Sequence, residues 1–365
     1  MSGAAATMTA NVAASTALRV LAIGAVTPVG GDARSTAAAV RAGLCGFREH
    51  AYMIDTAGEP MRVAQVAAMD AGLDGAARLV VLLAPALDEA LAGAGGRIAR
   101  LGVAVALPPP RPGGAQEAAG AVRALCEERL GGRLGPFQVF ASGHAGGFEA
   151  LDQARSWLRG GQVEAVIVAG VDSYLAPQTL EWLEAEDQLH GAGPLNNAWG
   201  FIPGEAAGAL LLARDGATPG SPPASRPWAE VLAVGLGHES KLNKSGEVCI
   251  GEGLTQALRR ALDEVPAAGV IDNVVCDMNG EAYRADEYGF SGLRVRDRLR
   301  DPTDFAAPAD CWGDVGAAGL PLHLLLAASA CRKGYAKGPL TLLWGSSDGG
   351  ERGAAVIRAE VSERA

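Results

Sequence analysis

Aromatic residues and long hydrophobic runs are both scarce in this chain of 365 residues. Phe, Trp and Tyr together make up 5% of the chain, whereas glycine occurs 50 times. This composition indicates helices packed closely on sheets and many tight turns. No apolar run reaches the roughly 18–20 residues of a transmembrane helix, so we expect no membrane partner. Residues 1–17 lack a basic segment followed by an apolar one, and we predict a disordered tail rather than a signal peptide.

Clusters of basic residues and metal-ligand spacings are also missing. The net charge is −10, and no run of Lys or Arg stands out, so we expect no nucleic-acid partner. The six cysteines form no CxxC pair, and the five histidines show no metal-ligand spacing. We therefore expect reduced cysteines in a cytoplasmic protein, with no metal and no cofactor.

Strands alternate with helices along the chain, which predicts an α/β fold. The apolar run at 163–170 is typical of a buried parallel strand, and the periodicity over 146–159 predicts a helix. The segment 215–227 is rich in Pro, Gly and Ser, and it is the clearest linker. We therefore predict one half over 18–214 and a second half over 228–365.

Four motifs follow one another in a characteristic order. They are a TPVG turn with a helix within 18–47, a strand–turn–helix–strand unit at 135–174, GFIPGEAAG at 200–208 and GAAG at 316–319. This series resembles the β-ketoacyl-acyl-carrier-protein synthases, the condensing enzymes of the thiolase fold. The resemblance implies an α/β fold with five layers, α-β-α-β-α, built from two similar halves. It also implies a dimer formed through the strand at 137–140.

The same resemblance implies three catalytic positions. In the family, a cysteine thiolate at a helix N-terminus takes up the acyl group. Two histidines then stabilise the enolate that forms when a malonyl thioester loses carbon dioxide. Matched motif by motif, the cysteine position holds His144, the first histidine position holds Asn279 and the second holds Gly313. We therefore predict that this chain does not condense acyl thioesters.

Other residues near these positions could contribute to a site. Asp314 follows Gly313 in a GDVGAAG turn that could aim its carboxylate into the pocket, as a substitute catalytic group. Ser142 lies where working members carry Thr or Ser, and its other interpretation is a hydroxyl bonded to turn backbone. The resemblance also places Phe201, Ser346 and Gly349 in motifs that border a substrate site.

Two interpretations of His144 and of Asn279 stay open. His144 is either a nucleophile or a ring that fills the old thiol pocket. Because a helix N-terminus disfavours imidazolium, we expect the ring to be neutral. Asn279 either donates a hydrogen bond to a thioester carbonyl or is a polar turn residue.

The acidic residues around the altered loop also allow two interpretations. Asp277, Glu281, Asp286 and Glu287 could include paired carboxylates for acid–base chemistry. A solvated acidic loop is the simpler alternative. Glu205, in the GFIPGEAAG motif, is expected to bond loop backbone.

Three classes of function remain at this point. The first is a non-condensing partner subunit in fatty-acid or polyketide-type acyl metabolism, as chain-length-factor subunits are beside an active ketosynthase. It would form a homodimer, or a heterodimer with a ketosynthase-like subunit, and could bind an acyl carrier protein. The second is a thioester-acting enzyme, such as a decarboxylase, acyltransferase or hydrolase, that uses His144. The third is a structural scaffold with a filled pocket.

Overall fold

The computed structural model describes residues 17–362, apart from residues 68, 71, 94–97, 215–225 and 267–268. The predicted tail at 1–17 and the predicted linker at 215–227 therefore lie almost entirely outside the described residues. Among the helices that are described, none is long and apolar enough to cross a membrane.

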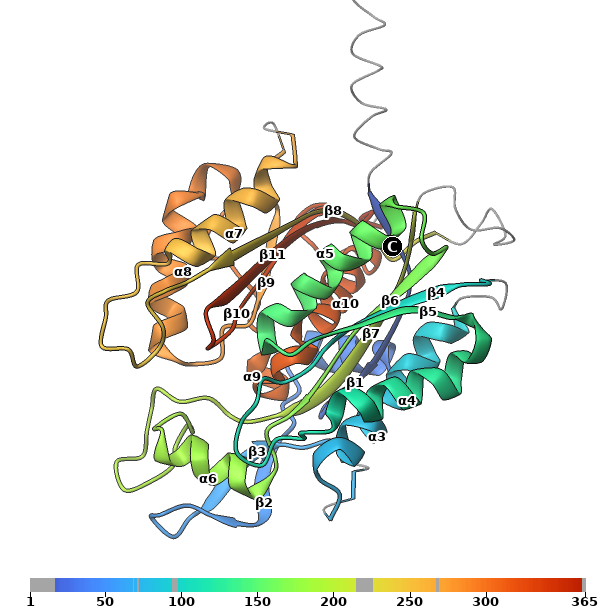
Figure 1. The fold of residues 1–365 in the computed structure, drawn as a ribbon. Helices are drawn as coiled ribbons and strands as arrows, with labels where there is room; N and C mark the ends of the chain where they lie inside the picture. Colours follow the sequence, from blue (N-terminus) through green and yellow to red (C-terminus); the bar gives the residue numbers. More distant parts are fainter. Residues whose placement is uncertain are drawn as a thin grey trace, which may run out of the picture.

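Nine strands of the described residues form one continuous sheet, which folds into two parts, called the first and the second sheet below (Figure 1). The first has the order β5 (Leu134–Phe140), β4 (Leu101–Ala106), β6 (Ala165–Ser173), β7 (Glu205–Arg214) and β1 (Leu18–Val26). The second has the order β8 (Ala229–His238), β11 (Glu351–Arg358), β10 (Leu340–Ser346) and β9 (Asn273–Cys276). A short ladder between β1 and β8, from Leu18↔Val231 to Val20↔Ala229, joins them.

Helices form the other three layers. Two helices, α5 (Gly146–Arg159) and α10 (Gly319–Arg332), lie between the sheets and contact strands of both. On the outer face of the first sheet lie α3 (Gly75–Ala92) and α4 (Ala118–Leu130), and on that of the second lie α7 (Glu252–Asp263) and α8 (Ala282–Arg294). The predicted α-β-α-β-α layering is therefore confirmed.

The two sheets repeat one topology, which confirms the prediction of two similar halves. In the first, β4 and β6 are parallel, β6 and β7 antiparallel, and β7 and β1 antiparallel. In the second, β9 and β10 are parallel, β10 and β11 antiparallel, and β11 and β8 antiparallel. The second half has isolated parallel bridges in the place of β5. They join Ala306 to Val275 of β9 and Leu299 to Ile271 just before β9.

The hydrophobic core explains why the central strands carry almost unbroken apolar runs. Val166 and Val168 of β6 face the middle helices, whereas Ile167 and Ala169 face α3 and α4. Because both faces of the strand are covered, alternation of apolar and polar residues disappears. The side chains of α5 and α10 consequently hold the two halves together through one shared core.

The remaining elements lie outside the layers. A hairpin of β2 (Phe47–Ile54) and β3 (Pro60–Ala64) packs with α6 (Pro177–Ala185) around a separate small core. The helix α2 (Ala33–Arg41) follows β1, and the short helix α9 (Ala309–Trp312) precedes α10.

Candidate functional site

His144 lies at the junction of β5 and α5. Gly143 adopts φ +73°, a left-handed conformation that favours glycine, and the chain turns there. A single 3₁₀ turn, η2 (Gly143–Ala145), then leads into α5. The imidazole is buried, with 7% of the residue exposed. The strand–turn–helix unit therefore aims the ring into the space between the two halves.

Asp314 comes from the second half and faces His144. It precedes the matching 3₁₀ turn, η4 (Gly316–Ala318), at the start of α10. Its backbone is held in both directions by the segment before β7: Asp314 N donates to Ile202 O, and Gly204 N donates to Asp314 O, both at 2.8 Å. The GFIPGEAAG motif thus fixes the position of this carboxylate.

The Asp314 carboxylate collects donors from three loops. His144 Nε2 lies 2.8 Å from Oδ1 and 3.0 Å from Oδ2. Asn279 Nδ2 donates to Oδ2 at 2.6 Å, and the Gly316 backbone N–H donates to Oδ1 at 2.8 Å. Since a carboxylate accepts hydrogen bonds, His144 Nε2 carries the proton in this contact.

A buried arginine on α8 closes the opposite side of the site. Arg284 is 2% exposed and donates from Nη1 to Asp277 Oδ2 at 2.9 Å and to Ser346 O at 2.6 Å. Its Nε donates to Glu281 Oε2 at 3.1 Å. Its Nη2 lies 3.5 Å from His144 Nε2. The guanidinium therefore neutralises the carboxylates of the Asn279 loop and lies beside the imidazole, with no hydrogen bond between Nη2 and Nε2 because both are donors.

The charges of this cluster shift the pKa values of its members. Burial disfavours a charged His144, but the adjacent Asp314 carboxylate outweighs it and raises the pKa of His144 above its ordinary value of 6.5. Burial alone would raise the pKa of Asp314, but His144, Arg284 and the Asn279 amide together hold it well below its ordinary range. The prediction of a neutral ring is therefore not supported, because it weighed the helix N-terminus alone and left out the charge of the Asp314 carboxylate.

Little empty space is left around these groups. The cavity that His144, Asn279, Gly313 and Asp314 line has a volume of about 10 Å³, which is at the lower limit for one water molecule. The backbone N–H groups at this end of the middle helices are also occupied: Ala145 N donates to Ser347 Oγ at 2.8 Å and Ala317 N to Asp172 Oδ2 at 3.0 Å. In the structure as described, the cavity has no room for a thioester.

Comparison with known proteins agrees with this architecture. Residues 129–217 match the family model for the N-terminal domain of β-ketoacyl synthases. The matched segment contains β5, the turn with His144, α5, β6 and β7. No curated protein matches the sequence.

Solved ketosynthase structures share the fold of nearly the whole chain. A type II polyketide ketosynthase in complex with its acyl carrier protein (AntDE:AntF) has a TM-score of 0.78 at 15% identity, over 94% of this chain and 99% of that one. The ishigamide ketosynthase/chain length factor has a TM-score of 0.66 at 20% identity, over 94% and 99%. The ketosynthase from module 6 of the bacillaene synthase of Bacillus subtilis 168 has a TM-score of 0.74 at 14% identity, over 94% and 72%. The chain therefore has the thiolase-like ketosynthase fold.

The structure brings together only some of the residues that the sequence singled out. The positions equated with the catalytic residues, together with Asp314, line one cavity. Four other predicted site residues do not line it. Ser142 Oγ donates to the Glu149 carboxylate, not to turn backbone. Phe201 packs edge-on against Tyr174 at 5.5 Å, Ser346 Oγ donates to Glu287 Oε2 at 2.6 Å, and Gly349 is exposed.

Asn279 has the contacts of a polar turn residue, which is one of its two predicted interpretations. Its Oδ1 accepts from the Glu281 backbone N–H at 3.1 Å. Its amide also donates to Asp314 Oδ2 at 2.6 Å and to Glu281 Oε2 at 3.0 Å. Because its donors are already used within the protein, it presents none to a ligand in this arrangement.

The solvated acidic loop predicted around Asn279 is wrong for three of its four residues. Asp286 is exposed, but Asp277, Glu281 and Glu287 are 8%, 5% and 0% exposed. Arg284 neutralises the first two, and Arg352 Nε donates to Glu287 Oε1 at 2.6 Å. A carboxylate is buried only when it is paired. Because the sequence did not identify the two arginine partners, it did not predict that these carboxylates are buried.

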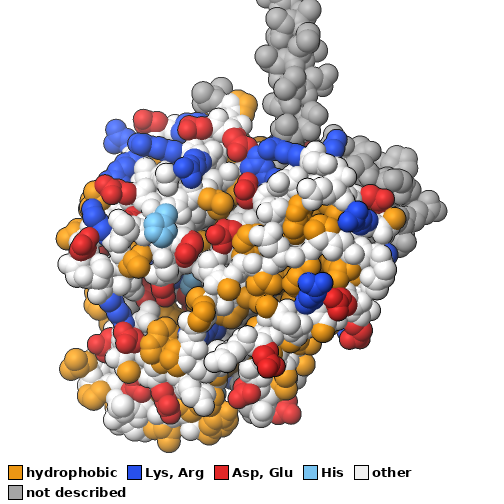
Figure 2. All heavy atoms as spheres, viewed as in Figure 1, with side chains coloured by type: hydrophobic (Ala, Val, Ile, Leu, Met, Phe, Trp, Pro, Cys, Tyr) orange, Lys and Arg blue, Asp and Glu red, His pale blue; other side chains and the backbone are white. Residues whose placement is uncertain are grey.

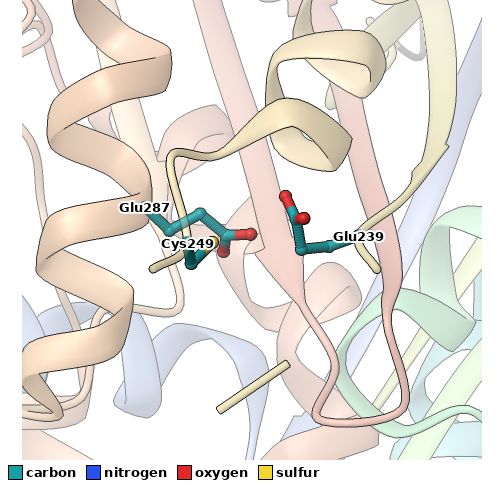
Figure 3. Close-up of side chains that lie close together, drawn as sticks. All are labelled: Glu239, Cys249 and Glu287. Atoms are coloured by element: carbon teal, nitrogen blue, oxygen red, sulfur yellow. The ribbon is translucent and has the colours of Figure 1, made fainter. Parts of the chain in front are cut away.

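A second buried group lies beside this cluster and resembles a metal site in its residue types. Glu239, Cys249 and Glu287 each offer a ligand atom, and these atoms lie within 4.8 Å of one another (Figure 3). The carboxylates are already engaged: Glu239 accepts from the backbone of Lys241 and Gly253, and Glu287 from Arg352 and Ser346. Burial also raises the pKa of the Cys249 thiol, which keeps the sulfur protonated. The group therefore functions as internal polar packing.

Sequence reasoning missed the two arginines that make the site possible. Arg284 lies one helical turn after Glu281 and one turn before Glu287 on α8, a spacing that signals side-chain pairing. Arg352 lies in β11 among inward-facing residues, and only its buried carboxylate partner, Glu287, explains why an arginine is buried there.

Glu205 has the structural role that the sequence predicted. Its Oε1 accepts from Val66 N at 3.0 Å, and Arg78 pairs with it.

Proposed function

We propose that this protein is a non-condensing, ketosynthase-like subunit that acts beside a condensing ketosynthase in fatty-acid or polyketide-type acyl metabolism. The observation that carries the proposal is the buried cluster of His144, Asp314, Asn279 and Arg284 at the position that the family uses for its nucleophile. These side chains satisfy one another, so the space that would hold a reacting thioester holds protein instead.

The exposed edge of the first sheet supports a partner role. Strand β5 pairs with β4 on one side and ends the sheet on the other. Its apolar residues Leu134, Phe137, Val139 and Phe140 are all half-buried in the single chain. Figure 2 shows hydrophobic side chains gathered on the side of the molecule where β5 lies. An unpaired strand edge with apolar side chains is suited to pairing with another chain.

The similar structures support the class of partner. They include a ketosynthase with its acyl carrier protein and a ketosynthase/chain length factor. On this basis the partner of the present chain is a ketosynthase that retains its cysteine, and an acyl carrier protein is the further component.

A thioester-acting enzyme that uses His144 fits the geometry less well. General-base or nucleophilic catalysis needs the ring within hydrogen-bond reach of a substrate. Here Nε2 is bonded to Asp314, and the adjoining cavity of about 10 Å³ has no room for a thioester. The scaffold alternative also has a filled pocket, and it differs from the partner-subunit proposal in requiring no ketosynthase.

Co-purification separates these functions. The full chain is co-expressed with the cysteine-bearing ketosynthase encoded nearest to it, and the complex is weighed by native mass spectrometry. The proposal predicts a 1:1 heterodimer, and no malonyl- or acyl-thioester turnover by the chain alone. A chain that stays a homodimer and binds neither ketosynthase nor carrier supports the scaffold instead. Thioester turnover that disappears in His144→Gln supports the enzyme.

A further inference from the structure

A groove at the far end of α10 is lined by several positively charged side chains. It lies between α2 and the C-terminal end of α10 and has a volume of about 910 Å³. Arg34, Arg41, Arg332 and Lys333 line it, and no Asp or Glu does among the residues that the structure describes, although the chain as a whole has a net charge of −10. A helix of 14 residues is about 20 Å long, which separates this groove from His144 at the other end of α10.

Two of the four cations are held in place by aromatic rings. The Arg332 guanidinium lies 3.9 Å from the centre of the Trp228 ring, and its Nη2 donates to Arg226 O at 3.0 Å. The Arg41 guanidinium lies 4.4 Å from the centre of the Tyr335 ring. Such stacking leaves the N–H groups at the guanidinium edge available to an anion.

The other two cations, Arg34 and Lys333, are exposed. Among the described residues, neither makes a side-chain hydrogen bond or a close ion pair, although the charge of Arg34 acts on the carboxylates of Asp32 and Glu89. Burial and the like charges of Arg226 and Arg34 lower the pKa of Arg332. Positive charge is therefore left without full compensation in the groove, and an anion would relieve it.

An apolar cavity adjoins this groove. It has a volume of about 300 Å³ and shares Arg41 and Tyr335 with the groove as lining residues. Its other walls are mostly aliphatic or aromatic side chains, among them Val40, Val274, Phe305, Leu326 and Ala330. Its one carboxylate, Asp304, is paired with Lys337. A positively charged groove and an apolar cavity thus meet at the Arg41–Tyr335 pair.

We propose that these adjoining cavities bind an organic phosphate that carries an alkyl or acyl chain. The phosphate lies against Arg34, Arg332 and Lys333, because guanidinium and ammonium groups give phosphate oxygens charge-assisted hydrogen bonds. The alkyl or acyl chain of the ligand lies against Phe305 and Leu326, where its apolar surface is removed from water. Both cavities are of a size that holds small ligands. The site is separate from His144 and does not depend on the proposed function.

The test uses the full chain and isothermal titration calorimetry with three probes. Decyl phosphate, below its micelle concentration, is compared with inorganic phosphate and with decyltrimethylammonium. The variant is Arg34→Gln/Lys333→Gln, since both residues are exposed and neither supports the core. The matched control is Arg296→Gln, whose side chain is 67% exposed and lies outside both cavities. Melting temperatures confirm that each variant is folded.

The proposal predicts saturable binding of decyl phosphate, at least about tenfold tighter than inorganic phosphate, and no binding of the cationic amphiphile. The double variant should weaken decyl phosphate binding about tenfold, and the Arg296 control should not. Equal affinity for decyl phosphate and inorganic phosphate would show that the apolar cavity does not bind the alkyl chain. Binding that the double variant leaves unchanged, or saturable binding of decyltrimethylammonium, overturns the phosphate site.

Discussion

The Asp314 carboxylate lies 2.8 Å from Nε2 of His144, although 170 positions separate the two residues in the chain. Asp314 precedes the middle helix of the second half, and His144 lies in the 3₁₀ turn that precedes the middle helix of the first. Their contact joins the two halves at the place where the ketosynthase family carries out its chemistry.

Removing the Asp314 carboxylate should destabilise the protein strongly. Asp314→Ala leaves His144, Asn279 and the Gly316 N–H without their acceptor, and removes the carboxylate that offsets the charge of a protonated His144. Breaking one partner of a buried charge pair costs about 3–5 kcal/mol of the free energy of unfolding. Urea unfolding followed by circular dichroism measures it. Exposed Asp286→Ala is the control, and equal stability of the two variants would contradict the buried pair.

Two buried histidines, His144 and His323, should make the free energy of unfolding depend on pH. Their combined contribution should be greatest near pH 6.5. Burial lowers the pKa of His323 from 6.5 to about 4, so between these pH values only the unfolded chain binds this proton, and stability falls as the pH falls. The pKa of His144 is raised above 6.5 by Asp314, so its contribution is complete below pH 6.5 and is lost as the pH rises through the raised value.

Two variants assign these slopes, with unfolding by urea measured from pH 4 to 9. His323→Gln should flatten the profile below pH 6.5 only, and His144→Gln should flatten it above pH 6.5 only. A profile that neither variant alters would show that the two rings do not titrate as their surroundings dictate.

Gly313 should not accept a side chain without strain. Its φ of +74° favours glycine, and an added Cβ would lie 2.7 Å from Ile202 O. Gly313→Ala should therefore cost about 1–3 kcal/mol of the free energy of unfolding. Gly161→Ala is the matched control, because Gly161 has φ +65° with open space around it. A loss at Gly313 no larger than at Gly161 would contradict the steric part of this argument.

A charge on the free edge of β5 should weaken the proposed heterodimer. Gln138 is the exposed residue of this strand, so Gln138→Lys leaves the core intact. Lysine on a strand edge opposes pairing with another strand, and the dissociation constant should rise about tenfold. Gln162→Lys, at an exposed site beyond the end of α5, is the control. Analytical ultracentrifugation measures both, and equal affinities would move the interface away from β5.

The sequence reaches the fold and part of the site, and particular residues show where it stops. Ordered motifs place His144, Asn279 and Gly313 at equivalent positions, and the turn before GAAG suggests that Asp314 faces them. The spacing of Glu281, Arg284 and Glu287 signals side-chain pairing but does not show that the pairs are buried. Without that information the carboxylates of Asp277 and Glu281 look solvated. The hairpin of β2 and β3 is missed for a similar reason, because its outer face is polar and its small core is completed by α6.

The elongation rate of the reconstituted pair tests the central claim most directly. The chain and its ketosynthase are combined with the acyl carrier protein and malonyl thioester, and the rate is measured with His144→Gln in this chain or with the catalytic cysteine of the ketosynthase replaced by alanine. The proposed partner role predicts that the cysteine variant abolishes elongation, while His144→Gln leaves the rate within about twofold of the original. Elongation by this chain alone would contradict a non-condensing subunit. So would the loss of elongation when a folded His144→Gln variant is combined with the unaltered ketosynthase.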